Sequence, residues 1–193
     1  MINPLHSGTP AGLMEYITQN NGLQHACRFR VSILRMGEEF ENTFLCNLAQ
    51  VPSARIKIYQ DILSGSSSPI PIPYGIEYSS NILEFSIEES WISRAYFEKW
   101  QSSIFAVSGG ETKAVPILNN RVRFYDDIIG KIRIEAISVQ GNIVPATYQL
   151  YGCVPMEIVP TQFESLNGFN NVLKFSVNMI YRYYTVTTSP TPQ

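Results

Sequence analysis

The chain has 193 residues and a mass of 21.8 kDa, which is enough for one hydrophobic core, and 45% of its residues are apolar. Charged residues make up only 16%, against roughly 25% in an average soluble domain, and the formal net charge is −2. These figures exclude a disordered chain and a protein that binds nucleic acid tightly through its overall charge. Because charged groups normally cover solvent-facing surface, the shortage of charge predicts a chain that buries much of its surface against other chains.

The first 80 residues predict an arm, several strands and a loop. Residues 1–26 are rich in Asn, Gly, Pro and Thr without clear periodicity, which predicts an N-terminal arm. Apolar and polar residues alternate over 27–35, as in a half-buried strand, and extended segments are also expected over 40–48 and 54–59. The segment 64–75 contains three prolines and two glycines, and proline lacks the N–H that a central strand needs. We therefore expect a long surface loop there.

One amphipathic helix is expected near the middle of the chain, over 88–105, after a strand over 81–87. Ser86 and Glu89 have the spacing of a capping box, which predicts the helix start. The apolar residues that recur at three- and four-residue spacing are Trp91, Ile92, Ala95, Tyr96, Trp100 and Ile104. This stripe is expected to face the core.

The C-terminal half predicts strands again, over 121–125 and 131–139, followed by two short extended pieces over 147–151 and 153–159. The last predicted element is a strand of about twelve residues over 173–184. Its alternation places six residues on one face, namely Leu173, Phe175, Val177, Met179, Tyr181 and Tyr183.

These elements predict a mainly β (α+β) fold, an antiparallel β-sandwich or barrel with one packed α-helix. We expect a single domain over 27–186, with the arm 1–26 before it, the loop 64–75 inserted in it, and a flexible polar tail over 187–193 after it. No stretch approaches the roughly 18 apolar residues that a membrane helix needs, so no membrane anchor is expected.

The sequence offers little for catalysis. The two histidines, His6 and His25, lie in the arm without a neighbouring cluster of acids or cysteines. The adjacent Asp126 and Asp127 would point to opposite sides of a strand and so converge poorly on one ligand. The three cysteines have irregular spacing, which favours free buried thiols. We expect no catalytic residue, no metal and no cofactor.

Charge is segregated along the chain. Residues 58–93 and 134–173 contain acidic residues but no Lys or Arg, whereas five cations lie between Lys113 and Arg133. Copies of one chain that meet each other could use such complementary patches to fix their register.

The C-terminal half carries a family resemblance in four segments. They are Arg-Ala-Tyr-Phe-Glu-Lys-Trp at 94–100, Phe-Tyr-Asp-Asp at 124–127, Tyr-Gln-Leu-Tyr-Gly-Cys-Val-Pro-Met-Glu-Ile at 148–158, and the aromatic strand that ends at 184. Over roughly residues 81–185 this order resembles the tail tube proteins of contractile-tailed, T4-like bacteriophages.

The resemblance implies hexameric rings in which each subunit donates strands to a continuous β-barrel, so that no sheet edge is left free at the barrel wall. Rings would stack into a tube that passes DNA when a surrounding sheath contracts. The implied partners are further copies of the chain, sheath and baseplate proteins, and a tape-measure protein and DNA in the lumen without specific binding. The implied location is the virion tail, assembled in the host cytoplasm.

The same resemblance assigns three groups of residues. Those expected to face the lumen are Lys174, Ser176, Asn178 and Arg182. Those expected in the core beneath the helix are Trp91, Trp100, Phe175, Val177, Met179 and Tyr181. Those expected to contact another ring or the sheath are Ile70, Ile72 and Tyr74.

Two alternatives stay open. A tube initiator of the baseplate, or the tube protein of another contractile injection system, would have the same fold. From a different class, a soluble β-sandwich that binds carbohydrate could stack sugars on Tyr181, Tyr183 and Tyr184.

Overall fold

The computed structural model describes residues 24, 27–35, 38–40, 45–61, 70–104, 123–138, 144–161, 163 and 172–188. Nearly all of the expected arm, with both histidines, and most of the expected tail lie outside these residues. The described part is mainly antiparallel β with one principal helix, which confirms the predicted fold class. Within it, no helix has the length and apolar content needed to cross a membrane.

The elements follow in this order: β1 (Phe29–Arg35), β2 (Glu38–Glu39), β3 (Cys46–Ala49), β4 (Ala54–Asp61), β5 (Ile70–Tyr78), β6 (Asn81–Ser86), α2 (Ile92–Ile104), α3 (Tyr125–Ile128), β7 (Gly130–Ala136), β8 (Ala146–Ile158), β9 (Lys174–Ile180) and β10 (Tyr183–Thr188).

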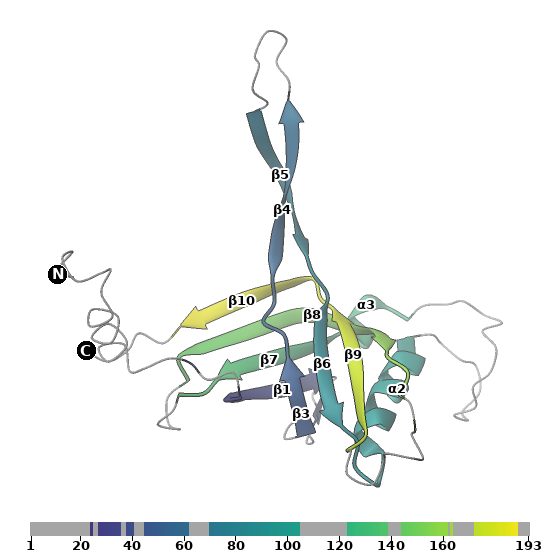
Figure 1. The fold of residues 1–193 in the computed structure, drawn as a ribbon. Coiled ribbons are helices and arrows are strands. Elements are labelled where there is room, and N and C mark those ends of the chain that lie inside the picture. Colours follow the sequence, from purple (N-terminus) through teal and green to yellow (C-terminus); the bar gives the residue numbers. More distant parts are fainter. Residues whose placement is uncertain are drawn as a thin grey trace, which may run out of the picture.

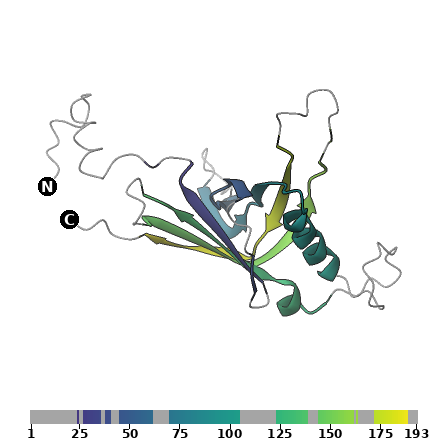
Figure 2. The ribbon, with the colours of Figure 1, turned by 90° about the horizontal axis from the view of Figure 1, so that it is seen from below.

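The main sheet has two halves that share the long strand β8. Its order is β2-β1-β7-β8-β9-β6-β3, and β10 also pairs with β8. The first part of β8, residues 146–151, pairs with β7 and β10 and forms what we call the β10 half-sheet, together with β1. The second part, residues 154–158, pairs with β9 and forms the β9 half-sheet, together with β6 and β3. Figure 1 shows β6 and β9 crossing the direction of β1, β7 and β10, and Figure 2 shows the two halves opening away from each other with α2 beside the β9 half-sheet.

The halves meet at a bend centred on Gly152. Leu150 and Cys153 are both fully buried, so the in–out alternation of β8 slips by one residue between them. Gly152 has a φ of 65°, in the left-handed region that glycine adopts without strain. A Cβ at this position would lie 2.5 Å from the Tyr125 hydroxyl oxygen and 3.1 Å from the Arg182 Cβ, so the bend also depends on the absence of a side chain.

The segment that pairs with β8, from β9 to β10, shifts its in–out alternation at the same level. Ile180 pairs with Val154 and Tyr183 pairs with Tyr151, so β9 and β10 follow β8 in one register across the bend. The expected strand over 173–184 is therefore two strands, and the expected pieces 147–151 and 153–159 are one strand. Tyr183, predicted on the buried face, is 43% exposed because the alternation slips before it is reached.

The core lies between the two half-sheets and is closed on one side by α2. Each described strand of the main sheet except β2 contributes to the cluster or packs against it, as do Phe40, Phe97 and Trp100. The helix begins at Ile92, four residues after the predicted start, and Ser86 belongs to β6 and not to a capping box. A carboxylate oxygen of Glu88 nevertheless accepts a hydrogen bond from the backbone N–H of Ser93, which satisfies one free donor of the first turn.

The buried side of α2 differs from the predicted stripe. It consists of Ser93, Phe97 and Trp100, whereas Ile92 is 58% exposed. Trp100 donates its indole N–H to the Ile128 carbonyl oxygen at 2.7 Å and so joins α2 to α3. Where a strand was expected over 121–125, the described residues from 123 onward instead lead into this short helix.

The hairpin of β4 and β5 rises clear of the rest of the molecule in Figure 1 and forms a separate two-stranded sheet. The prediction of a surface loop is wrong for residues 70–75, which are part of β5. Pro71 and Pro73 are compatible with this strand because each strand of a two-stranded sheet is an edge strand. Residues 62–69 lie outside the described part of the chain.

Candidate assembly surfaces

The hairpin exposes a large share of the apolar surface of the molecule. Its exposed apolar residues are Ile56, Ile58, Tyr59, Ile70, Ile72, Tyr74 and Ile76. Ile56 pairs directly with Ile76, and Tyr59 pairs with Ile72, so apolar residues face solvent on both sides of the ribbon. A two-stranded hairpin is at best marginally stable in water by itself. The three residues expected to contact another ring, Ile70, Ile72 and Tyr74, are 48%, 45% and 68% exposed in the single chain.

The base of the hairpin is joined to the body by an aromatic cluster. The Tyr78 ring lies 5.8 Å from that of Tyr181 and 5.9 Å from that of Tyr184. Tyr181 donates its hydroxyl to the Ser53 carbonyl oxygen at 3.1 Å, and Ser79 donates its N–H to the same oxygen at 3.3 Å. Burial raises the pKa of Tyr181 above its ordinary value of 10.0, so its hydroxyl remains a donor in alkaline as well as neutral solution. The hairpin is thereby fixed to the bend between β9 and β10.

The β10 half-sheet has two incompletely paired edges. Among the described residues, β10 pairs only with β8. The outer edge of β1 is occupied only at Leu34 and Arg35, which pair with β2, and at Ile33, whose carbonyl oxygen accepts a hydrogen bond from the Phe40 N–H at 2.8 Å. Unpaired N–H and C=O groups at such edges are sites where another strand can add.

The outer face of the β10 half-sheet carries three rows of side chains that cross all four strands. The cross-strand register gives the rows as Arg30–Glu135–Thr147–Thr187, Ser32–Arg133–Gln149–Thr185 and Leu34–Lys131–Tyr151–Tyr183. The residues between them on β1 and β7, such as Val31 and Ile132, are buried in the core. The face is thus polar except at the row nearest the bend.

Charges on this face are only partly compensated. The Glu135 carboxylate lies 3.8 Å from an Arg30 nitrogen and 4.0 Å from an Arg133 nitrogen, so two guanidinium groups share one acid. The Lys131 ammonium lies 5.8 Å from the centre of the Tyr151 ring, which is a cation–π distance. Tyr151 in turn stacks on Tyr183 with ring centres 4.8 Å apart.

The outer face of the β9 half-sheet holds three of the four residues expected at the lumen. Lys174, Ser176 and Asn178 alternate along β9 with buried residues. Lys174 forms an ion pair with Glu84 at 3.1 Å, and Asn178 donates its side-chain amide to Glu157 at 2.8 Å. The fourth residue, Arg182, is exposed at the bend and lines a different feature, a cleft of about 450 Å³ beside Tyr125 and Lys131.

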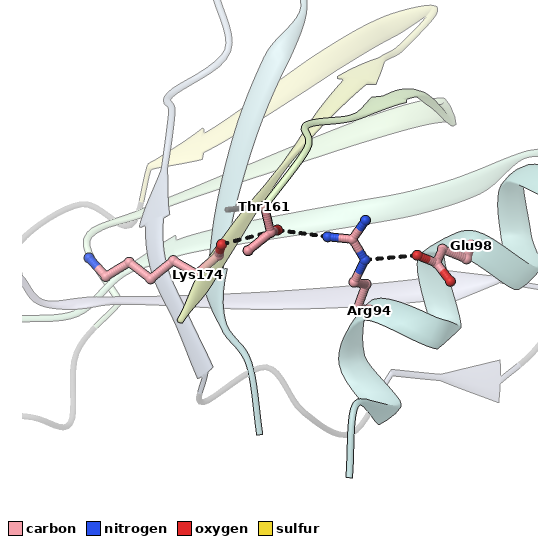
Figure 3. A network of polar contacts seen from close by, with 4 residues as sticks. All are labelled: Arg94, Glu98, Thr161 and Lys174. Carbon is pink, nitrogen blue, oxygen red and sulfur yellow. Dashed lines mark hydrogen bonds and ion pairs between the residues drawn. The ribbon is translucent and has the colours of Figure 1, made fainter. Parts of the chain in front are cut away.

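A polar network fixes the start of β9 to α2, as Figure 3 shows. Arg94 donates from Nε to Glu98 at 2.8 Å and from Nη1 to the Thr161 hydroxyl at 2.7 Å. The Thr161 hydroxyl donates to the Lys174 carbonyl oxygen at 3.3 Å. Lys174 is therefore held by its backbone and its side chain within the same subunit.

Five of the six residues expected beneath the helix lie in the core, namely Trp100, Phe175, Val177, Met179 and Tyr181. Trp91 does not. It is 38% exposed, has a φ of 56°, and lies with its ring 6.0 Å from that of Phe163. It precedes the helix, so its side chain does not share the buried side of α2. The sequence stripe missed Phe97, which is fully buried and contacts Phe85 and Phe175.

The described residues contain no group of three or more His, Cys, Asp or Glu side chains placed to hold a metal ion. All three cysteines are free, and Cys27 is exposed, contrary to the expectation of buried thiols. Burial raises the pKa of Cys46 and of Cys153 to about 12, so neither is a thiolate at neutral pH. Asp126 and Asp127 are exposed on α3 and not on a strand.

Chains of two large assemblies, the anti-feeding prophage and the extracellular contractile injection system PVC, have a similar fold. The chain is similar to a chain in the baseplate of the anti-feeding prophage, with a TM-score of 0.62 and 12% identity, covering 86% of this chain and 97% of that one. It is also similar to a chain of the sheath–tube complex of the extracellular contractile injection system PVC (TM-score 0.57, 12% identity, 86% and 93% covered). A third similarity is to a chain of the tube-terminating cap of the anti-feeding prophage (TM-score 0.57, 14% identity, 86% and 92% covered). At these identities the similarity establishes the fold.

The fold is thus that of proteins in tube, cap and baseplate assemblies. Residues 17–187 match the phage tail tube protein family, and the chain belongs to that family. No curated protein sequence matches it.

Proposed function

We propose that the chain is the subunit of the tube of a contractile tail or related injection particle. Copies form hexameric rings, and the rings stack into a conduit for DNA. The observation that carries the proposal is a family match over most of the chain together with a half-sheet that has two incompletely paired edges among the described residues. The role is structural and not enzymatic. The sheath, the baseplate and a tape-measure protein are the further partners, and the assembled particle is the location.

Ring closure follows from strand direction. Because β1, β7, β8 and β10 are successively antiparallel, β1 and β10 run in opposite directions. The β1 edge of one copy can therefore pair with the β10 edge of the next as an antiparallel neighbour, which continues the sheet around a barrel. In this arrangement the outer face of the β10 half-sheet lines the lumen. The hairpin of each ring, with Ile70, Ile72 and Tyr74, contacts the neighbouring ring.

The alternative lumen face is the one expected from sequence, with Lys174, Ser176 and Asn178. Two observations favour the β10 half-sheet. The side chain and backbone of Lys174 are already engaged within the subunit. In addition, α2 contacts the part of β8 that ends the β9 half-sheet, where Gln101 donates its side-chain amide to the Met156 carbonyl oxygen at 3.2 Å.

The first experiment is negative-stain microscopy of the concentrated protein. Rings or hollow tubes support the proposal. A protein that stays monomeric at every concentration and binds glycans would overturn it in favour of a carbohydrate-binding module.

A second experiment tests the edges. In a Cys27→Ser background, Ser32→Cys and Thr185→Cys place one thiol on each open edge. Within one chain the two positions are three strand spacings apart, about 14 Å. A bismaleimide shorter than this distance should link copies into a ladder that ends at a closed ring, whereas each single-cysteine variant should give none. Tubes that form but never crosslink would assign the lumen to the other face, which Asn178→Cys labelling would then test.

A further inference from the structure

The outer face of the β10 half-sheet carries more cations than acids, although the chain as a whole is slightly acidic. The chain has a formal net charge of −2, yet this face carries three cations, Arg30, Arg133 and Lys131, and a single carboxylate, that of Glu135. The side chains of Arg30 and Arg133 are 59% and 51% exposed, so both guanidinium groups remain accessible to a ligand.

The distances show that Glu135 compensates the positive charges on this face only weakly. Both arginine contacts to Glu135 are 3.8 Å or longer, beyond hydrogen-bond distance, and exposed ion pairs of this kind contribute little. Lys131 has no carboxylate within 4.0 Å among the described residues and is held over the ring of Tyr151. That ring is fixed by stacking on Tyr183 and by its hydroxyl, which donates to the Gln149 side chain at 2.6 Å.

The two outer faces differ in sign. On the β9 half-sheet, the one cation Lys174 is paired with Glu84 at 3.1 Å, and Glu157 adds a second acid. Cations thus outnumber acids on the β10 half-sheet and acids outnumber cations on the β9 half-sheet. A polyanion should therefore bind the outer face of the β10 half-sheet in preference to that of the β9 half-sheet.

We propose that the outer face of the β10 half-sheet is a low-affinity contact surface for the phosphate backbone of nucleic acid. This rests on the proposed function, in which that face lines the conduit. The register places the β7 cation Arg133 directly beside Gln149 of β8, and both types of side chain can contact phosphate oxygens. Two arginines favour phosphate, which they can bind in a bidentate way. The shared Glu135 keeps the attraction weak, which suits a ligand that must move along the surface.

The test uses unassembled full-length protein separated by size exclusion, a fluorescently labelled DNA duplex, and anisotropy measured over a series of salt concentrations. The variants Arg133→Gln and Lys131→Gln each remove one cation from the face. Each should weaken binding about eightfold near 0.1 M salt and lower the slope of log affinity against log salt by about 0.9. Lys174→Gln is the matched control, because it removes an exposed cation from the other face, and it should leave both quantities unchanged.

Three results would overturn the inference. They are no measurable DNA binding at low salt, equal effects of Arg133→Gln and Lys174→Gln, and competition by poly-L-glutamate as strong as that of DNA at equal charge, which would assign the face to acidic polypeptides. Microscopy of the same variants separates this failure from failure of the proposed function. Arg133→Gln should still form tubes. Tubes without DNA binding refute only the inference, whereas a protein that never forms rings or tubes refutes the proposed function whatever DNA it binds.

Discussion

Gly130 tests how rigidly the core holds Trp100. A Cβ built at Gly130 would lie 2.6 Å and 2.8 Å from two ring carbons of Trp100 and 3.0 Å from the Leu34 carbonyl oxygen. The indole has no obvious way to retreat, because its N–H is bonded to Ile128 at 2.7 Å and its ring is fully buried against Phe97. Gly130→Ala therefore forces a packed ring or a backbone strand to shift.

The expected cost follows from two effects. Overpacking of a filled core destabilises by about 1–3 kcal/mol, and loss of the Trp100 hydrogen bond would add about 1 kcal/mol. In the opposite direction, replacing glycine by alanine restricts the unfolded chain, which stabilises the folded state by about 0.4–1 kcal/mol. We expect Gly130→Ala to lower the free energy of unfolding by about 2 kcal/mol.

The assay is urea unfolding of dilute, unassembled protein followed by tryptophan fluorescence. Gly75→Ala is the matched control, because its Cβ would meet no atom within 4 Å, and its effect should stay within about 0.5 kcal/mol. If Gly130→Ala proves as stable as Gly75→Ala, the indole is free to move and the reasoning about the core is refuted.

Three further predictions concern the hairpin and the buried groups. Ile72→Asp should leave rings intact but abolish tubes in negative stain, because it puts a charge on the apolar hairpin, whereas Arg55→Gln should form tubes normally. Tyr181→Phe should cost about 0.5–1.5 kcal/mol in urea unfolding through loss of the hydrogen bond to the base of the hairpin; an unchanged value would show that the bond contributes nothing. Because burial raises the pKa of the Cys46 and Cys153 thiols from 9.0 to about 12, their contribution to stability is complete below pH 9 and is lost as pH rises toward 12. Each should lower the free energy of unfolding by up to about 1.4 kcal/mol per pH unit there, and replacing either by Ala should make that decline less steep.

Alternation with period two was enough to locate most of the main sheet. It predicted β1, β6, β7 and β9 within about two residues at most of their ends, because each has one face in the core and one in contact with solvent or polar neighbours. The alternation failed to predict the bend, because a one-residue shift between the buried and exposed faces leaves the amino-acid composition of the segment unchanged. The two pieces expected over 147–151 and 153–159 leave Gly152 between strands, although it is the point at which one strand changes face.

The other errors also have physical causes. Proline in β5 was taken as evidence against a strand, but the hairpin has only edge strands, where missing donors are tolerated. Helical spacing and the family resemblance both predict Trp91 in the core, but its positive φ, which excludes it from the helix, has no sequence signature. The two candidate lumen faces both alternate polar residues with buried ones, so sequence alone could not choose between them. The contacts of Lys174 and of α2 that favour one of them arise from the arrangement of the elements in space.

The in–out alternation shifts by one residue at Gly152 in β8 and at Arg182 between β9 and β10. These two matching shifts also limit where residues can be inserted or deleted. Inserting or deleting one residue in β8 alone would turn over the side chains of one half-sheet while the other stayed in place, and would bring residues such as Leu150 into solvent. Only a matching change in the β9–β10 strand, at the same level, would retain the pairing across the bend. Relatives whose residues differ almost everywhere should therefore keep the distance along the chain from each slip to the core residues on either side of it, and their insertions should fall in the connecting loops.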